Sequence, residues 1–313
     1  MRRFLLPVAA ILLVPVIAVT ALPGVRYLRS DRETLDLNAD TRRGVPGSFV
    51  RLRDGVTHYQ LAGPADGAAV LLIPGFSTPY NVWDPTFDGL TAAGFRVLRY
   101  DLYGRGWSDR PAVRYDADLY DRQITDLLDA LGISVVDAAG VSMGGPIAAT
   151  LANRHPERVR RVLLFDPGYW TDKPLPFGLR LPVVGTYNMT VVIAPGLPES
   201  QWDDFAHPER YPRYLDPYRQ QMRYRGFRRA LLETLRNYLT HDVTGEYRQL
   251  GKSGKPVLLI WGKWDRDTPI ALSAQVRAGV PQAQFHAIDD AAHVPHYEHP
   301  EIVNPIVIDF LHR

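Results

Sequence analysis

A serine set between two glycines, where an apolar run gives way to a helical one, limits the fold of this chain more than any other feature. The segment Gly140-Val141-Ser142-Met143-Gly144 follows the apolar residues 135–139 and opens a helical stretch at 143–154. A serine on a sharp strand-to-helix turn exposes its hydroxyl, and the crowded positions two before and two after it require glycine. The segment predicts a nucleophilic Ser142 at the carboxyl end of a strand; the alternative is a glycine-rich turn with a surface serine.

Short apolar runs without polar alternation predict a parallel sheet, because strands that are buried on both faces have this composition. They lie at Ala69–Ile73, Phe95–Tyr100, Val135–Ala139, Val162–Phe165 and Val257–Trp261. Helical patterns occur between or after them at 118–131, 143–154 and 301–311. Strands that alternate with helices form a sheet covered on both faces.

Two local signals add detail to this α/β pattern. Asp54-Gly55 predicts a hairpin within residues 49–61. Thr268 is expected to cap a helix that has Pro269 at its first position.

The strand–helix rhythm stops at residue 169 and resumes after residue 251, so the core is predicted at 47–168 and 252–313. Several prolines and then an aromatic, arginine-rich stretch at 211–238 occupy the interval, which predicts a mostly helical cap inserted between two core strands. Such a cap lies over the carboxyl edge of the sheet, and its aromatic rings either wall a substrate pocket or pack the cap's own core. The rings in question are Trp170, Trp202, Phe205 and Tyr224. The arginines and tyrosines at 211–229 either bind anionic groups such as lipid or form solvated helix faces.

The amino terminus resembles a targeting segment. Arg2 and Arg3 precede an uncharged apolar run at residues 4–22, which fits a signal peptide or a membrane anchor. The basic residues before the run predict a catalytic domain outside the cytoplasm, although Arg26, Arg29 and Arg32 weaken that orientation signal. A buried helix is the alternative. Residues 23–46 are polar and non-periodic and are predicted to be a linker.

Charge and cysteine content exclude several classes of function. The chain has 36 basic and 34 acidic residues, a net charge of +2 that does not favour nucleic acid as a partner. It has no cysteine, which excludes a disulfide scaffold, a thiol nucleophile and a cysteine-ligated metal.

A histidine and an acid follow the serine along the chain, each after a predicted strand. His293 comes after the apolar run 285–288 and before the last helix, with His296 as its main rival. Asp265 follows Trp261-Gly262 at the end of the fifth apolar run. An acid in this role orients the histidine and stabilises its charged form.

Two other carboxylates remain open for that role. Asp166 follows the fourth apolar run, and Asp267 lies two residues after Asp265, where it is otherwise a charge at a helix start.

An oxyanion intermediate requires two backbone N–H donors. Met143, directly after the serine, provides one, and Phe76 in Pro74-Gly75-Phe76 is predicted to provide the other unless that segment is a simple strand-ending turn. The loop at 101–111 contains glycines and a proline but no obvious catalytic group, which indicates a structural role.

Taken together, these motifs resemble those of the α/β-hydrolase superfamily, in its lipase, esterase and C–C hydrolase branch. The resemblance covers about residues 49–313 and implies an eight-stranded, mostly parallel sheet with a pocket between sheet and cap. It also implies Ser142 as nucleophile, Asp265 as acid and His293 as base. One departure is that Pro74-Gly75 stands where many relatives have His-Gly, which leaves the geometry of the oxyanion loop less certain.

The predicted function is hydrolysis of a small carboxylic ester with an apolar acyl or alkyl part, through an acyl-enzyme on Ser142 and without a metal or organic cofactor. The apolar amino terminus favours a lipid-derived ester, such as a monoacylglycerol, as the substrate. Alternatives are C–C bond hydrolysis or cofactor-free perhydrolysis with the same triad, and a non-catalytic ligand-binding module on a hydrolase scaffold.

Overall fold

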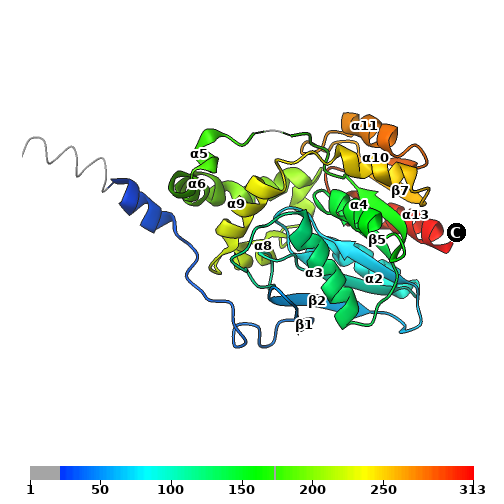
Figure 1. Ribbon diagram of the computed structural model, residues 1–313, viewed down its shortest axis with the longest axis horizontal. Helices are drawn as coiled ribbons and strands as arrows, with labels where there is room; N and C mark the ends of the chain where they lie inside the picture. Colours follow the sequence, from blue (N-terminus) through cyan, green and yellow to red (C-terminus); the bar gives the residue numbers. More distant parts are fainter. Residues whose placement is uncertain (1–21, 173) are drawn as a thin grey trace, which may run out of the picture.

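The computed structural model describes residues 22–172 and 174–313, so the predicted signal or anchor segment lies almost entirely outside the described residues. A central sheet is covered by helices on both faces, and a further group of helices extends from one edge of this core (Figure 1). Among the helices that the structure describes, none is both long and apolar enough to cross a membrane.

Eight strands form one sheet in the order β1-β2-β4-β3-β5-β6-β7-β8. They are β1 (Ser48–Arg51), β2 (Val56–Ala62), β3 (Ala69–Ile73), β4 (Arg96–Tyr100), β5 (Val136–Val141), β6 (Val159–Phe165), β7 (Val257–Gly262) and β8 (Gln284–Ile288). Strand β2 pairs antiparallel with β1 and with β4, and all other neighbours are parallel. The predicted hairpin at Asp54-Gly55 and all the predicted apolar strands are therefore present, within a few residues of the expected bounds.

The helices that cover the sheet fall into two layers with separate apolar cores. One face packs against α3 (Ala117–Ala130), α4 (Gly144–Arg154), α10 (Thr244–Lys252) and α11 (Ser273–Gly279). The other face packs against α2 (Asp84–Ala92) and α13 (Pro300–His312). Alternate residues of β3 enter different cores: Leu71 lies in the first and Leu72 in the second. Both faces of the central strands are buried, which explains why their sequences show no polar alternation.

The segment between β6 and β7 is mostly helical, as predicted. It contains α5 (Phe177–Arg180), α6 (Pro182–Asn188), α7 (Leu197–Ser200), α8 (Leu215–Gln221), α9 (Phe227–Asn237), short 3-10 and π turns, and α10. The inserted helices end earlier than the residue 251 expected from sequence. Tyr247 and Leu250 of α10 are buried in the core shared with α4, so this helix belongs to the core layer rather than to the cap.

The segment predicted to be a linker has more structure than its sequence indicates. Residues 22–30 are helical, and residues 33–36 then contact the cap next to α9. The Glu33 carboxylate accepts hydrogen bonds from the backbone N–H groups of Gly226 (2.8 Å) and Arg228 (2.6 Å) at the start of α9. The Arg228 guanidinium also pairs with Asp31 and Glu33. A polar, non-periodic sequence does not reveal these contacts because their partners lie almost 200 residues away.

Candidate active site

Ser142 occupies the tight turn between β5 and α4 that its flanking glycines predict. Its φ is +53°, a left-handed conformation that is uncommon for a residue other than glycine. A Cβ on Gly140 would lie 2.0 Å from the Gly144 carbonyl oxygen, and one on Gly144 would lie 2.4 Å from the Ile73 carbonyl oxygen. Both positions therefore require glycine for steric reasons, and the turn holds Ser142 at the carboxyl edge of the sheet.

His293 and Asp265 form a buried pair at the same edge. The distance between His293 Nδ1 and Asp265 Oδ2 is 2.8 Å. Burial opposes protonation of His293, but the Asp265 carboxylate outweighs it and raises the pKa of His293 to about 9. Burial also favours the neutral form of Asp265, yet the charge and hydrogen bond of His293 hold the pKa of this carboxyl below its usual value. The pair thus has the polarity needed to stabilise an imidazolium.

Thr268 contributes to this pair instead of capping a helix as predicted. Its hydroxyl donates to Asp265 Oδ2 at 2.6 Å, and its backbone N–H donates to Oδ1 at 2.9 Å. The following 3-10 turn starts after Pro269, whose ψ of 138° is not helical. Sequence reasoning missed this role because the Thr-Pro pair is also a common start of a helix.

The rival acid Asp166 lies beside the pair but does not replace Asp265. Its side chain is buried, one oxygen accepts the Gly262 N–H at 2.8 Å, and the other has no hydrogen-bond partner among the described residues. Burial and then the Asp265 charge raise the pKa of Asp166 well above its usual range. The carboxylate that contacts His293 is therefore that of Asp265.

The other rival residues have different surroundings. His296 is fully buried between Trp83 and Phe165, and its Nε2 lies 3.1 Å from the Val82 carbonyl oxygen. Burial lowers the pKa of His296 to about 3, which fits a neutral packing residue. Asp267 is exposed at the rim of the cavity that contains Ser142.

The predicted oxyanion loop after β3 lies against the serine. A Cβ on Gly75 would be 3.4 Å from Ser142 Cβ. Met143 stands at the N-terminal cap of α4, and within the described chain neither its N–H nor that of Phe76 is engaged in a hydrogen bond. Both N–H groups are thus available, and the positive end of α4 adds to the potential that an oxyanion would experience.

Arg105, in the loop predicted to be structural, links this oxyanion loop to the cap. Its side chain is completely buried. Nε donates to the Phe76 carbonyl oxygen at 2.7 Å, and a terminal nitrogen donates to Thr234 Oγ1 of α9 at 2.9 Å. Gln221 of α8 makes a parallel link, because its amide nitrogen donates to the Ser77 carbonyl oxygen at 2.8 Å.

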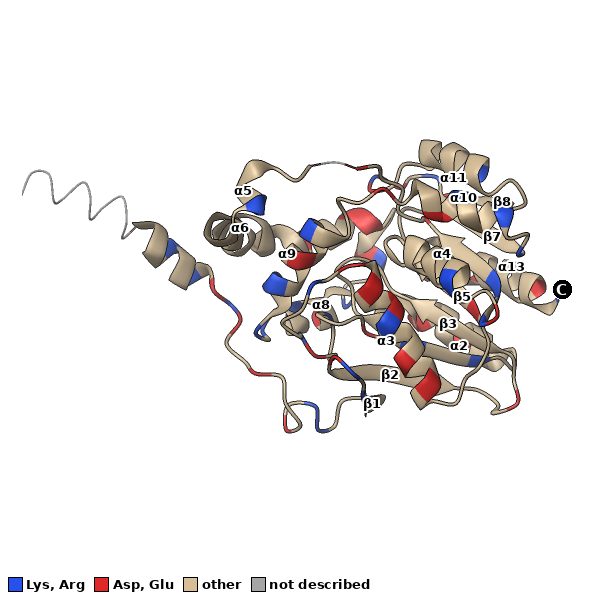
Figure 2. Ribbon diagram, viewed as in Figure 1, with Lys and Arg blue, Asp and Glu red and all other residues tan. Residues whose placement is uncertain are grey.

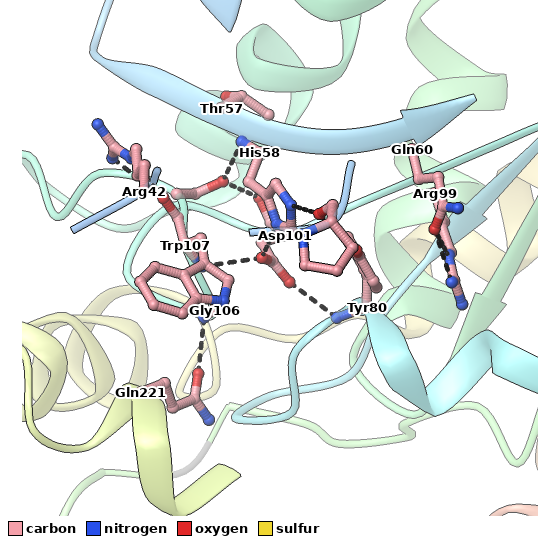
Figure 3. A network of polar contacts seen from close by, with 12 residues as sticks. Arg42, Thr57, His58, Gln60, Tyr80, Arg99, Asp101, Gly106, Trp107 and Gln221 are labelled. Carbon is pink, nitrogen blue, oxygen red and sulfur yellow. Dashed lines mark hydrogen bonds and ion pairs between the residues drawn. The ribbon is translucent and has the colours of Figure 1, made fainter. Parts of the chain in front are cut away.

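The start of the same loop is fixed by the Asp101 carboxylate (Figure 3). Asp101 accepts the backbone N–H groups of Tyr80 (2.8 Å) and Trp107 (2.9 Å), and it lies 2.7 Å from His58 Nδ1. Gly106 donates its N–H to Gln221 Oε1 at 2.7 Å. Loop 101–111 therefore connects the core, the oxyanion loop and the cap. Its glycines and proline predicted a structural role but not these contacts.

A cavity of about 160 Å³ lies over Ser142 and His293. The cap closes it with Leu197, Ser200, Gln201 and Asp204. None of the four aromatic residues expected to wall the pocket lines this cavity. They pack against other aromatic rings instead. Trp170 contacts Tyr238, and Tyr224 contacts Trp107. Trp202 and Phe205 belong to a cluster with Tyr211, Tyr214 and Tyr297. Composition alone does not distinguish a ring that packs the cap from one that faces substrate.

Asp204 is the functional candidate that sequence reasoning missed. It is 6% exposed, faces the cavity from a 3-10 turn at Gln201–Asp204, and makes no side-chain hydrogen bond within the described residues. Burial, opposed by the charge of His293, raises the pKa of Asp204 to about 7. The cavity thus contains an acid whose pKa is raised toward neutral pH. Asp204 is recognised only because the fold brings it close to Ser142 and His293. Its sequence context gives no such signal.

The carboxylates near His293 do not form a metal site. Ligand atoms of Asp166, Asp265 and His293 lie within 4.8 Å of one another. However, both oxygens of Asp265 already accept hydrogen bonds, and one oxygen of Asp166 accepts the Gly262 N–H. The group provides an oriented base rather than a set of free anionic ligands.

A mostly parallel eight-stranded sheet, with a strained serine after β5, an acid after β7 and a histidine after β8, defines the class of α/β-hydrolases. The sequence model of the alpha/beta hydrolase fold family matches residues 68–300. The chain belongs to this family, as the sequence motifs predicted.

Known proteins of this family resemble most of the chain. A 2-hydroxy-6-oxononadienedioate/2-hydroxy-6-oxononatrienedioate hydrolase of Cupriavidus pinatubonensis is 28% identical over 84% of this chain and 94% of its own length. The 2-hydroxymuconate semialdehyde hydrolase of Pseudomonas putida is 30% identical over 79% of this chain and 88% of its own length. The crystal structure of an enol-lactonase from Burkholderia xenovorans has a TM-score of 0.73 at 23% identity and covers 85% of this chain and 100% of that one. The chain is thus a hydrolase of this family, and the relatives differ in the bond that they cleave.

Proposed function

We propose that the protein hydrolyses a small carboxylic ester through an acyl-enzyme on Ser142. His293 accepts the Ser142 proton as the hydroxyl oxygen attacks the carbonyl carbon, and Asp265 stabilises the resulting imidazolium. The N–H groups of Phe76 and Met143 hold the oxyanion. His293 then protonates the departing alcohol and activates water, which releases the acid and restores the serine.

The observation that carries the choice of an uncharged substrate, such as an ester with an apolar acyl group, is the charge of the cavity. Its lining contains the acids Asp204 and Asp267 but no lysine or arginine. A substrate with a carboxylate near the reacting carbon would meet these acids without a lysine or arginine to pair with it. An uncharged acyl group fits better, and an engineered cavity of about 150 Å³ holds benzene, so a cavity of this size admits an acyl chain of about six carbons.

Carbon–carbon bond hydrolysis is the second candidate, and the names of the curated relatives favour it over an ester. Asp204 also supports it, because an acid with a pKa of about 7 above Ser142 can supply the proton that a departing carbon requires. The same acid, however, disfavours a dicarboxylate such as the dienedioates in those names. The candidate substrate is therefore an uncharged diketone.

One comparison tests both candidates. The purified chain is assayed with p-nitrophenyl esters of increasing acyl length and with an uncharged vinylogous diketone, and the active serine is labelled with a fluorophosphonate. We expect ester turnover with a maximum near four to six acyl carbons, and loss of both turnover and labelling in Ser142→Ala, roughly a millionfold in kcat. Diketone turnover without ester turnover would replace the ester by the second candidate. Normal labelling of Ser142→Ala would contradict the proposed mechanism, because Ser142 would then not be the nucleophile.

We further propose that the protein is exported or anchored at a membrane through residues 4–22, with its catalytic domain outside the cytoplasm. The support is the apolar run after Arg2 and Arg3. Cell fractionation of the full chain tests it: recovery in the soluble cytoplasmic fraction would contradict the proposal.

A further inference from the structure

Exposed apolar side chains are concentrated at one end of the molecule. Eight of the ten large hydrophobic residues that are exposed in the described part of the chain lie in only three short segments. These are Leu22, Val25 and Leu28 in the amino-terminal helix, Phe177, Leu181, Val183 and Val184 in α5 and α6, and Val192 in the turn after α6. Soluble surfaces carry such residues singly, whereas a cluster of them marks an interaction site.

The three segments lie side by side. Tyr27 of the amino-terminal helix lines one hollow together with Pro182 and Thr186 of α6. Arg29 and Ser30 line a second hollow with Ala194 and Pro195. Figure 1 shows the amino-terminal helix, α5 and α6 together at the end of the molecule that is farthest from α13. We call residues 22–29, 177–184 and 192 the apolar end.

The charge of the apolar end has one sign. Residues 22–30 carry Arg26 and Arg29 and no acid. Residues 174–198 carry Arg180 as their one charged residue. Figure 2 shows blue without red on the amino-terminal helix and on α5, and neither colour on α6. Apolar side chains rimmed by exposed arginines are complementary to a bilayer that contains anionic lipid.

We propose that the apolar end is a membrane-contact surface that docks on an anionic bilayer. The chain outside the described residues supports this partner over another protein, because the apolar run 4–22 ends where the amino-terminal helix begins. The proposal goes beyond the reaction and does not depend on the bond that is cleaved. It also places the surface near the catalytic cavity, since exposed Val192 and cavity-lining Leu197 are five residues apart.

The absence of cysteine from the sequence permits a direct test in the full chain. Phe177→Cys and Val183→Cys are each labelled with an environment-sensitive nitrobenzoxadiazole probe and mixed with vesicles of phosphatidylcholine and phosphatidylglycerol. Trp264→Cys and Ile302→Cys serve as matched controls, because within residues 22–172 and 174–313 they are the two exposed large hydrophobic positions outside the apolar end. We expect a blue shift and quenching by nitroxide-bearing lipid at positions 177 and 183 and at neither control.

The charged rim gives a second readout. Arg26→Gln and Arg29→Gln should each weaken vesicle binding of the labelled chain roughly fivefold, and added salt should reduce the difference. Arg53→Gln, an exposed arginine in the hairpin loop, should change nothing. Equal responses at positions 183 and 302, or no response at 177 and 183, would overturn the proposal. A probe response that rises with protein concentration and needs no lipid would show that a second copy of the chain covers the surface instead.

Discussion

At the scale of single residues, the site contains three carboxylates whose pKa values are shifted differently. The partnership with His293 lowers the pKa of Asp265, burial raises the pKa of Asp166, and burial raises the pKa of Asp204 to about 7. Burial acts on all three, so the differences come from their partners: Asp265 accepts several hydrogen bonds, and the other two accept few or none. Each carboxylate therefore responds differently to removal of its charge.

Replacing the triad acid tests its assignment. Asp265→Asn should lower kcat by about 10⁴, because the amide holds the wrong tautomer of His293. Asp166→Asn should cost far less, since the carboxylate that is hydrogen-bonded to His293 Nδ1 is that of Asp265. The measurement is steady-state ester hydrolysis, with circular dichroism to confirm folding. A greater loss in Asp166→Asn would transfer the role of acid to that residue.

Removing the charge of Asp204 should change the pH dependence. His293 must be neutral to accept the Ser142 proton, so kcat/KM rises as pH increases through the pKa of His293, which is about 9. The ionised Asp204 helps to raise that pKa, after Asp265. Asp204→Asn should therefore shift the acidic limb of the kcat/KM profile to lower pH. Asp267→Asn should shift it less in the same direction, and a shift of Asp204→Asn to higher pH would contradict this account.

At the scale of elements, the cap fragment Leu197–Asp204 forms the roof of the cavity. Leu197 supplies the apolar part of this roof, so Leu197→Ala should enlarge the cavity and move the preferred ester to a longer acyl chain. The acyl-length panel with p-nitrophenyl esters measures this. Trp202→Ala is the matched control, because Trp202 lies in the same segment but packs on Phe205 and should alter stability rather than chain-length preference. An unchanged profile in Leu197→Ala would assign the acyl group to another part of the cavity.

The core elements could be predicted from sequence, whereas the cap contacts could not. Runs such as Ala69–Ile73 are apolar throughout because both faces are covered, and the glycines around Ser142 are required by contacts within a few ångströms. Order along the chain then located Asp265 and His293. Asp204 and Arg105 act through partners in other elements, and nothing within a few residues of them indicates those partners.

At the scale of the whole molecule, residues 31–36 of the amino-terminal segment bind the cap, while Arg42 further along the segment binds Asp109 and the Trp107 carbonyl in loop 101–111. Glu33 accepts two N–H groups at the start of α9 and pairs with Arg228, and its side chain is 9% exposed. Glu33→Ala should lower the free energy of unfolding by about 2 kcal/mol, which combines the loss of a helix cap with the loss of a largely buried ion-pair partner.

Urea unfolding of the full chain measures this change. Asp36→Ala is a suitable control, because Asp36 pairs with Arg225 where both side chains are more than half exposed, and such pairs contribute at most about 1 kcal/mol. Equal effects of the two substitutions would show that Glu33 does not fasten the segment.

The buried side chain of Arg105 has a consequence for the evolution of this chain. Its guanidinium donates to the backbone carbonyls of Phe76 and Tyr103 and to the Thr234 hydroxyl, and loss of Thr234 would leave one N–H of a buried charge without its partner. Substitutions at positions 105 and 234 are therefore tolerated together more readily than singly. Among homologous sequences, the two positions should covary, and lineages that have lost the arginine should also have changed the threonine.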